Sequence, residues 1–314
     1  MAEPSGRVIT VALVGRTNVG KSSLFNALAE EKLSIVTRKP HTTRFPVAAS
    51  IAGPSGIIWF WDTPGASERP THPMQRWLND SVWQSADRAD FLLFVVEAMR
   101  WLPADQSVLE QARRAGKLMG GVVTKIDRVR SKTILLPFMT RLAAQPDMLF
   151  WVPVSATRHD NLSRLIACVD EHASPAVPQP AAALPERRGL FFPDFAAELF
   201  RERLMERLSD ELPYALHVLC SRWVEEANRM EIEFRIVVER PGQKRIVVGT
   251  GGQVLRQVGS AVRVDLERQT GKKVMLRSWV EVDPDWSLQR PEAILRPDAG
   301  RVDSQPAPRL PGHG

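Results

Sequence analysis

The sequence has few cysteines, a single tyrosine and no long hydrophobic run. Its 314 residues include two cysteines, Cys168 and Cys220, which are too few and too far apart for a disulfide framework or a zinc site. The longest apolar runs, 91–96 and 120–124, fall far below the roughly 18 residues that a membrane-spanning helix needs. Residues 1–7 are polar and show no signal-peptide cleavage pattern, so we do not expect secretion.

The charge is positive and unevenly distributed. The formal net charge is +6, which permits binding to nucleic acid or to an anionic membrane surface. Residues 241–280 hold eight basic side chains against only two acidic ones. The eight are Lys244, Arg245, Arg256, Arg263, Arg268, Lys272, Lys273 and Arg277. This window alone therefore accounts for the excess of the whole chain.

The length predicts two domains of unequal size. From residue 8 to about 174, short apolar runs alternate with longer amphipathic stretches, which is typical of βαβ units around a largely parallel sheet. The expected strands are 8–14, 57–61, 91–96, 121–124 and 149–154. A proline-rich segment then interrupts every regular pattern. We predict a first domain over 1–173 and a linker over 174–190.

The remaining sequence predicts a smaller domain over 191–290 with the element order αββααβ. The expected elements are a helix at 195–208, strands at 216–224 and 232–238, helical stretches that follow the glycines at 249–252 and reach residue 269, and a strand at 273–282. Arginines in the first helix raise the alternative of a membrane-surface helix, but interspersed glutamates favour packing on the sheet. Residues 291–314 are rich in proline, glycine and charge, so we expect a disordered tail.

The strongest local signal is the complete P-loop pattern GRTNVGKS at 15–22, placed between an expected strand and an expected helix. Its glycines let backbone N–H groups surround phosphate oxygens, and the lysine adds a positive charge. The serine hydroxyl is a ligand for Mg²⁺. The candidate nucleotide-binding residues of this segment are Gly15, Asn18, Val19, Gly20, Lys21, Ser22 and Ser23.

Three later motifs follow expected strands in the order that a guanine nucleotide site requires. Asp62 of DTPG suits a contact to Mg²⁺, and the amide of Gly65 would face the γ-phosphate. In the run Thr124, Lys125, Ile126, Asp127, the aspartate would accept hydrogen bonds from guanine, and the lysine would cover the base plane. Ser155 and Ala156 would offer a backbone amide to guanine O6.

A fourth motif, Gly249-Thr250-Gly251-Gly252, fits the GXXG loop with which KH domains clamp single-stranded RNA. It follows a β-branched run, precedes an expected helix and lies inside the basic window. The candidate RNA-binding residues are Gly249, Thr250, Gly251, Gly252, Lys244, Arg245 and Arg256.

With these motifs in place, residues 8–289 resemble the Era family of bacterial GTPases. The resemblance rests on GRTNVGKSSLFNAL, SIVTRKPHTTR, WDTPG, FVVEAMRWLPAD, ELPYAL, ERPGQKRIVVG and DPDW. It implies an α/β P-loop NTPase G domain with a mostly parallel sheet, followed by a smaller α+β type II KH domain. It also implies a GTP-hydrolysing switch that binds the 3′ end of 16S ribosomal RNA and assists assembly of the small (30S) ribosomal subunit.

The same resemblance implies GTP or GDP and Mg²⁺ as ligands. Thr43 would be the switch I threonine that closes on Mg²⁺ beside Ser22, and Asn18 would hold a potassium ion near the phosphates. The implied switch I spans about 34–44 and switch II about 65–77. A cytoplasmic monomer with peripheral association at the inner face of the membrane is also expected.

Three positions depart from related patterns. Gly65 is followed by Ala66, where Ras-like proteins have a glutamine, which predicts slow hydrolysis and leaves no certain catalytic residue beyond the switch positions Thr43 and Gly65. Thr124 replaces the usual asparagine, and Gly251 replaces a usual basic residue. These departures leave open an RNA-binding scaffold with a weakened G domain. A GTPase acting in tRNA modification is a third alternative, which the KH-like half disfavours.

Overall fold

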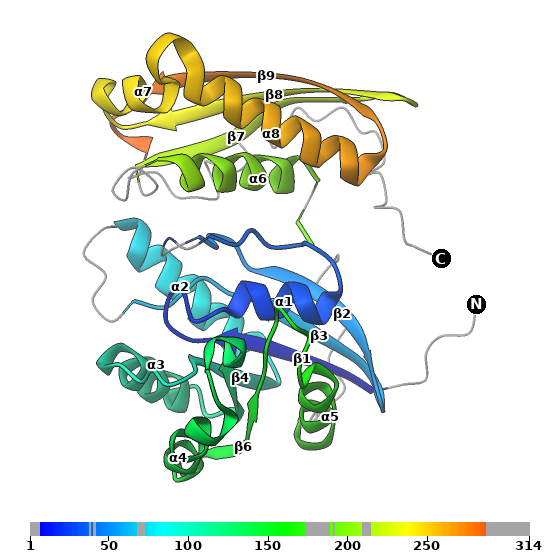
Figure 1. Ribbon diagram of the computed structural model, residues 1–314, viewed down its shortest axis with the longest axis vertical. Helices are drawn as coiled ribbons and strands as arrows, with labels where there is room; N and C mark the ends of the chain where they lie inside the picture. The colour runs from blue at the N-terminus through cyan, green and yellow to red at the C-terminus, as the bar shows by residue number, and fades with distance from the viewer. Residues whose placement is uncertain are drawn as a thin grey trace. The chain divides into compact units, whose positions relative to one another are not determined.

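The chain forms two compact units, residues 1–190 and 191–314 (Figure 1). The computed structural model describes residues 7–37, 39, 42–67, 73–173, 189–190, 192–208 and 215–286. The predicted tail at 291–314, and the predicted linker except for Gly189 and Leu190, lie outside these residues. Gly189 donates its N–H to the carbonyl of Ala48, 2.7 Å away, within the first unit.

The first unit is a six-stranded sheet with helices on both faces. The strand order is β2-β3-β1-β4-β5-β6, in which every neighbouring pair is parallel except β2 and β3. The elements are β1 (Arg7–Val14), α1 (Lys21–Ala29), β2 (Val47–Gly53), β3 (Gly56–Asp62), α2 (Pro73–Arg88), β4 (Phe91–Glu97), α3 (Pro103–Arg114), β5 (Leu118–Thr124), η1 (Ile126–Arg128), α4 (Lys132–Ala143), β6 (Met148–Pro153) and α5 (Leu162–His172).

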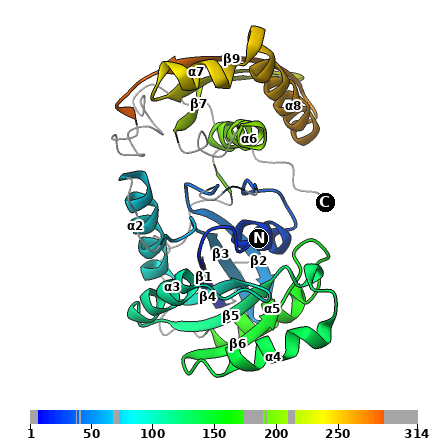
Figure 2. The same cartoon turned by 60° about the vertical axis from the view of Figure 1, so that its left-hand side comes forward.

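Alternation along β1 divides the core of this unit between the two faces of the sheet. Ile9, Val11 and Leu13 point to the face covered by α1 and α5. Ala12 and Val14 point to the other face and pack with α2, α3 and α4. Figure 2 shows α1 and α5 on the opposite side of the sheet from α2 and α3. Burial on both faces explains why β1 reads as a continuous apolar run.

Strand β2 was not predicted from the sequence. Its residues, VAASIAG, are mostly small and have little intrinsic preference for a strand. The strand exists because it pairs with β3 along its full length, from Val47 opposite Asp62 to Gly53 opposite Gly56. Gly56 is required at this hairpin, because a Cβ atom there would lie 1.9 Å from the carbonyl oxygen of Arg7. The sheet is therefore mostly parallel, with one antiparallel edge.

The carboxyl ends of the parallel strands carry the predicted nucleotide motifs. β1 ends at Val14 before the P-loop, β3 ends at Asp62, and β5 ends at Thr124. Parallel strands end at the same edge of a sheet, which is where ligands bind in open α/β folds. The fold therefore places motifs that are far apart in sequence at one edge.

The second unit is a three-stranded sheet in the order β7-β8-β9, with β8 antiparallel to β7 and parallel to β9. Its elements are α6 (Phe192–Arg207), β7 (Leu216–Glu225), β8 (Arg229–Val238), α7 (Pro241–Val248), η4 (Thr250–Gly252), α8 (Gln253–Thr270) and β9 (Lys273–Val282). This order matches the prediction. Both helical stretches were expected after the glycines, however, and the structure places α7 before them. The β-branched run 246–248 completes α7, so the GXXG loop joins two helices.

Helices α6 and α8 pack on one face of this sheet (Figure 1). Val258, Val262 and Leu266 recur every four residues along α8 and are fully buried. On α6, the ring of Phe200 contacts that of Phe234 in β8, with centroids 5.0 Å apart. The apolar side of α6 thus packs on the sheet of its own unit, as the sequence analysis predicted for this helix. Among the described helices, none is both long enough and apolar enough to cross a membrane.

Candidate nucleotide and RNA sites

The P-loop turns tightly between β1 and α1, and two of its glycines are required by the backbone. A Cβ atom at Gly15 would lie 2.5 Å from the carbonyl oxygen of Val95 in β4. Gly20 has a φ of 103°, which L side chains rarely adopt, and it directly precedes α1. The turn therefore brings the N-terminus of α1 to the edge of the sheet, in the arrangement that binds phosphate in P-loop proteins.

Each of the five consecutive carbonyl groups at 15–19 accepts a hydrogen bond from a side chain. Lys21 Nζ donates to the first two at 2.9 Å each, and Arg16 Nη1 donates to the third at 3.1 Å. Lys125 Nζ donates to Asn18 O at 2.6 Å, and the Thr124 hydroxyl donates to Val19 O. With its carbonyls held in this way, the loop is organised to present its N–H groups to an anion.

The candidate magnesium position is formed by Asp62, Ser22 and Thr43. Asp62 is fully buried, and its carboxylate lies beside the hydroxyls of Ser22, Ser34 and Thr43. Burial raises its pKa to about 6, although the Ser22 hydroxyl and the positive charge of Lys21 oppose this shift. The Ser22 and Thr43 hydroxyl oxygens lie 2.7 Å apart. A buried carboxylate beside two hydroxyls fits a hydrated Mg²⁺ ion, which takes oxygen ligands.

Lys21 is buried on the phosphate side of the same position. Burial lowers its pKa to about 8, and the negative charge of Asp62 opposes this change. Its ammonium group lies against the carbonyls of Gly15 and Arg16. A bound phosphate would provide this cation with a full negative charge in place of two carbonyl dipoles.

The candidate base-binding residues follow β5 and β6. Ser155 Oγ donates to Asp127 Oδ1 at 2.7 Å and accepts from the N–H of Arg158 at 3.1 Å. These bonds fix the carboxylate that is expected to accept from guanine. Lys125 adopts a left-handed conformation with φ 59°. Ala156, half-buried, follows Ser155 directly.

Thr124 takes a structural role in linking the P-loop to the sheet. Besides its bond to Val19, its hydroxyl lies 3.0 Å from Val96 O in β4. A hydroxyl has one proton, so the two carbonyls share a single donor. An asparagine amide would offer two N–H groups at this position. The threonine therefore retains the link to the P-loop with one donor fewer.

Side chains of α1 and α2 anchor the ends of the predicted switch segments. Asn26 in α1 accepts from the N–H groups of Leu33 and Ser34 and donates to Ser34 O. In α2, Asn79 accepts from the N–H of Ser67 and donates to its carbonyl, both at 2.8 Å. Residues 38, 40–41 and 68–72 of these segments lie outside the described part of the chain.

Gly65 lies against the P-loop. A Cβ atom at this position would lie 2.5 Å from Thr17 Cγ2, so only glycine fits in this conformation. The next residue, Ala66, donates its N–H to Gly15 O at 3.1 Å. The start of switch II is therefore in contact with the predicted phosphate site.

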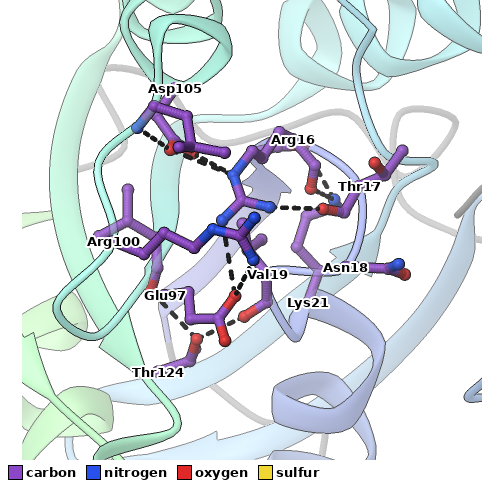
Figure 3. Close-up of polar contacts among 12 residues, drawn as sticks. Arg16, Thr17, Asn18, Val19, Lys21, Glu97, Arg100, Asp105 and Thr124 are labelled. Carbon is purple, nitrogen blue, oxygen red and sulfur yellow. Dashed lines mark hydrogen bonds and ion pairs between the residues drawn. The ribbon is translucent and has the colours of Figure 1, made fainter. Parts of the chain in front are cut away.

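Three residues of the site were missed by the sequence analysis. Arg16, Glu97 and Asp105 form a buried or half-buried ion-pair cluster beside the P-loop (Figure 3). The signal available in the sequence was weak: Arg16 occupies a variable position of the P-loop pattern, Glu97 ends an apolar strand and Asp105 begins a helix. Only the fold brings them together.

The second unit presents the GXXG loop with positive φ at three glycines. Gly249 has φ 74°, and a Cβ atom there would lie 2.5 Å from Val254 Cγ2. Gly251 and Gly252 have φ of 57° and 77° with open space around them. Thr250, Lys244 and Arg245 are exposed nearby in sequence. Arg256, also exposed, donates from Nη2 to Gly251 O at 3.3 Å, so its charge lies at the loop.

No group of three or more His, Cys, Asp or Glu side chains that could hold a metal ion occurs within the described residues. The Mg²⁺ position above differs in kind, because it relies on one carboxylate, two hydroxyls and the phosphates of a ligand. Asn18, the residue implied in potassium binding, is exposed on the P-loop with φ 61°.

Comparisons with known proteins match both units of the chain. A family model described as a 50S ribosome-binding GTPase matches residues 10–125, and a KH domain model matches residues 211–287. GTPase Era of Marinobacter nauticus is 37% identical over 286 residues, covering 90% of this chain and 92% of the relative. GTPase Era of Stenotrophomonas maltophilia is 39% identical over 287 residues, covering 88% and 93%.

Two solved structures match almost the whole chain. Era in complex with MgGDPNP and nucleotides 1506–1542 of 16S ribosomal RNA superposes with a TM-score of 0.84 at 31% identity, covering 92% of this chain and 98% of that one. A variant of Aquifex aeolicus Era bound to GDP and AlF4⁻ gives a TM-score of 0.83 at 30% identity, with the same coverage.

The fold and the two sites define a P-loop G domain followed by a KH domain. Relatives more than 30% identical over nearly the full length also identify the family of the chain. It belongs to the GTPase Era family, as the sequence resemblance indicated.

Proposed function

We propose that this protein is a GTP-hydrolysing switch that binds the 3′ end of 16S ribosomal RNA through its KH unit and assists maturation of the 30S subunit. The observation that carries the proposal is the organised but incompletely neutralised nucleotide site. The carbonyls of residues 15–19 each accept a side-chain hydrogen bond, while burial of the Asp62 carboxylate raises its pKa to about 6. A solved relative with Mg²⁺, GDPNP and 16S RNA supports the same ligands.

In this proposal Gly15 to Ser23 bind the phosphates, with Lys21 as the cation. Ser22, Thr43 and Asp62 hold Mg²⁺, which when bound neutralises charge on the β- and γ-phosphates. Asp127, fixed by Ser155, accepts from guanine, and Lys125 covers the base. A potassium ion at Asn18 would add positive charge near the transferred phosphate; the family resemblance supports this step.

Hydrolysis is expected to be slow. Ala66 follows Gly65 and has no group with which to orient or deprotonate water. The main role of the nucleotide would then be to set the conformation of the switch segments. Thr43 and Gly65 lie beside the P-loop, where a γ-phosphate and its Mg²⁺ would contact both, so loss of the γ-phosphate would remove those additional contacts. We propose that this change controls how the KH unit engages RNA.

The test of the nucleotide assignment is equilibrium binding of fluorescent GDP and ATP analogues with Mg²⁺, in potassium and in sodium buffers. Micromolar or tighter binding that favours guanine is the expected result. In a separate assay of GTP hydrolysis, replacing sodium by potassium should increase the hydrolysis rate more than it changes the affinity for the nucleotide. Equal affinity for the two bases would contradict the role given to Asp127.

The RNA assignment is tested with a single-stranded oligonucleotide that matches the 3′ end of 16S RNA. Binding should weaken at least tenfold in Gly252→Asp, because the added carboxylate repels the phosphate backbone at the GXXG loop. Aspartate tolerates the left-handed conformation of Gly252 better than most residues, so the KH unit should remain folded. GDP affinity should be unchanged in this variant.

A second candidate function is an RNA-binding scaffold whose G domain binds GTP poorly. Thr124 favours this alternative, because its single hydroxyl proton is shared between the carbonyls of Val19 and Val96. The side-chain amide of an asparagine could donate one N–H to each carbonyl. Weak or absent GDP binding together with full RNA affinity would select this alternative.

The cellular setting is proposed from the family resemblance alone. We propose a monomer that acts in the cytoplasm, with peripheral association at the inner face of the membrane. Light scattering of the purified protein would test the first point. Fractionation of cells, with a salt wash of the membrane pellet, would test the second.

A further inference from the structure

Glu97, the last residue of β4, belongs to none of the nucleotide motifs, yet its carboxylate contacts two of them. Oε1 lies 3.1 Å from Lys125 Nζ in the base motif. Oε2 lies 3.5 Å from Arg16 Nη2 in the P-loop. Arg100 approaches the same oxygen from outside at 3.8 Å. The Glu97 side chain is only 17% exposed, so these interactions are partly shielded from water.

Arg16 is held firmly on its own side of the cluster. Its Nε lies 2.9 Å from Asp105 Oδ1, and its Nη1 donates to Thr17 O. Asp105 is fully buried and accepts from the N–H of Leu102 at 2.8 Å, just before α3 begins. Figure 3 shows Arg16 placed between Asp105 and Glu97. The position of Arg16 is thereby tied to the sheet and to α3.

Lys125, in contrast, depends on few contacts. Its long side chain carries the amine to two acceptors, Glu97 Oε1 and Asn18 O. The aliphatic part between the backbone and the amine is the surface that would cover a base. Its placement is therefore set by where those two acceptors lie, and Glu97 is the charged one.

We propose that Glu97 is a positioning residue that fixes Lys125 at the distance from the P-loop that a guanosine diphosphate or triphosphate spans. This inference rests on the proposed guanine nucleotide function. Glu97 touches neither phosphate nor base in this role. It acts by holding Lys125 on one oxygen and the fixed Arg16 on the other.

The test compares Glu97→Gln with Glu110→Gln, the same chemical change at an exposed position of α3. The dissociation constant for GDP should rise about tenfold in Glu97→Gln, because a charge-assisted contact to Lys125 is lost. The inhibition constant of tripolyphosphate, which occupies only the phosphate side, should stay within about twofold of that of the parent protein. Glu110→Gln should bind both ligands as the parent does.

A double-mutant cycle with Lys125→Met separates positioning from a general structural effect. If Glu97 acts through Lys125, Glu97→Gln should change GDP affinity by less than about twofold in the Lys125→Met background. Multiplicative losses in the double variant would overturn the proposal. So would equal weakening of GDP and tripolyphosphate, or unaltered GDP binding in Glu97→Gln.

Two further measurements keep the result interpretable. Thermal unfolding of both glutamine variants shows whether they remain folded. If Glu97→Gln does not fold, Glu97→Asp keeps the charge but withdraws it by one methylene, and the same selective loss for GDP is expected. Failure of the parent protein to bind GDP overturns the proposed function and this inference together, whereas normal parental binding with insensitive variants overturns the inference alone.

Discussion

Asp62 and Lys21 carry opposite charges in the same buried part of the nucleotide site, and burial disfavours the charged form of each side chain. The pKa of Asp62 is raised to about 6 and that of Lys21 is lowered to about 8. Their mutual attraction therefore does not compensate for the loss of water. A metal ion beside Asp62 and a phosphate beside Lys21 would supply the missing counter-charges. The nucleotide-free site is thus held at a cost to stability that the ligands would offset.

The first prediction concerns Asp62→Asn. Because the folded pKa of Asp62 is raised, the folded state binds more protons than the unfolded state between about pH 4 and pH 6. The contribution of Asp62 to the free energy of unfolding is therefore largest below this range. It falls as the pH rises from about 4 to 6 and stays lower above pH 6. Asp62→Asn should remove this decline and raise the free energy of unfolding at pH 7.5 by about 1–3 kcal/mol.

Urea denaturation of the nucleotide-free protein at several pH values measures this effect. The exposed Asp80→Asn is the matched control and should retain the pH dependence of the parent protein. The same Asp62 variant should lose the Mg²⁺ dependence of GDP binding. Destabilisation at pH 7.5 would show that Asp62 is satisfied in the free protein.

The second prediction concerns Gly251, the exposed middle glycine of the GXXG loop. A lysine there has open space around it and would add one phosphate contact. Gly251→Lys should steepen the dependence of log affinity on log salt by about 0.7, the increment for one phosphate on a single strand. The φ of 57° costs about 1 kcal/mol in stability for a residue other than glycine.

Titrations of the RNA oligonucleotide between low and moderate salt measure the slope. Gly251→Ala is the control, because it has the same backbone strain without the charge, and its slope should equal that of the parent protein. If lysine and alanine behave alike, no phosphate passes this position.

At the scale of elements, switch I begins where α1 ends, and one side chain makes the connection. Asn26 forms three hydrogen bonds to the backbone of Leu33 and Ser34. The third prediction is that Asn26→Ala destabilises the first unit by about 1.5–3 kcal/mol, because it leaves partly buried backbone groups unpaired. Hydrogen exchange should accelerate at the amides of residues 33 and 34 and remain unchanged in β4.

Asn79 offers a comparison for this prediction, since it clamps Ser67 with two bonds of the same kind in α2. Asn79→Ala should accelerate exchange at residue 67 and leave residues 33 and 34 protected. If either variant releases both segments, the two switches are coupled and are not anchored separately.

The sequence predicted the elements that have strong periodicity and motifs with fixed geometry. The P-loop could be located because its glycines, lysine and serine are required by the turn and the phosphate. Strand β2 could not, because its alanines and glycines form a strand only through pairing with β3. The cluster of Arg16, Glu97 and Asp105 was equally hidden, since those residues meet only after β4 and α3 pack beside the P-loop.

Helix α7 shows the same limit in the second unit. The run Ile246 to Val248 is β-branched, and its composition alone favours a strand. In the structure it closes a helix, with Val247 buried and Gly249 ending the helix at a positive φ. Packing against the sheet thus decided the conformation against local propensity.

At the scale of the whole molecule, the chain divides between residues 190 and 191 into units that carry separate sites. The predicted boundaries at 173, 190 and 290 remain to be tested by limited proteolysis. Each unit has its own sheet and its own buried core, so a ligand of one should stabilise that unit directly.

The fourth prediction follows from this division. GDP with Mg²⁺ at about 100 times its dissociation constant should stabilise the first unit by roughly 2.7 kcal/mol. For a unit of this size the melting temperature should rise by about 2–4 °C per kcal/mol. Calorimetry of the full chain should show the increase in one transition, while RNA should shift the other.

Lys21→Ala is the control for both the GDP and the RNA experiments. It removes the cation of the phosphate site, so the GDP-dependent shift should vanish while the RNA-dependent shift remains. Gly252→Asp should give the reverse pattern. If GDP raised both transitions equally in the parent protein, the units would unfold as one body. If, in addition, a mutation in either site weakened binding at both, the assignment of two separable sites would lose its support.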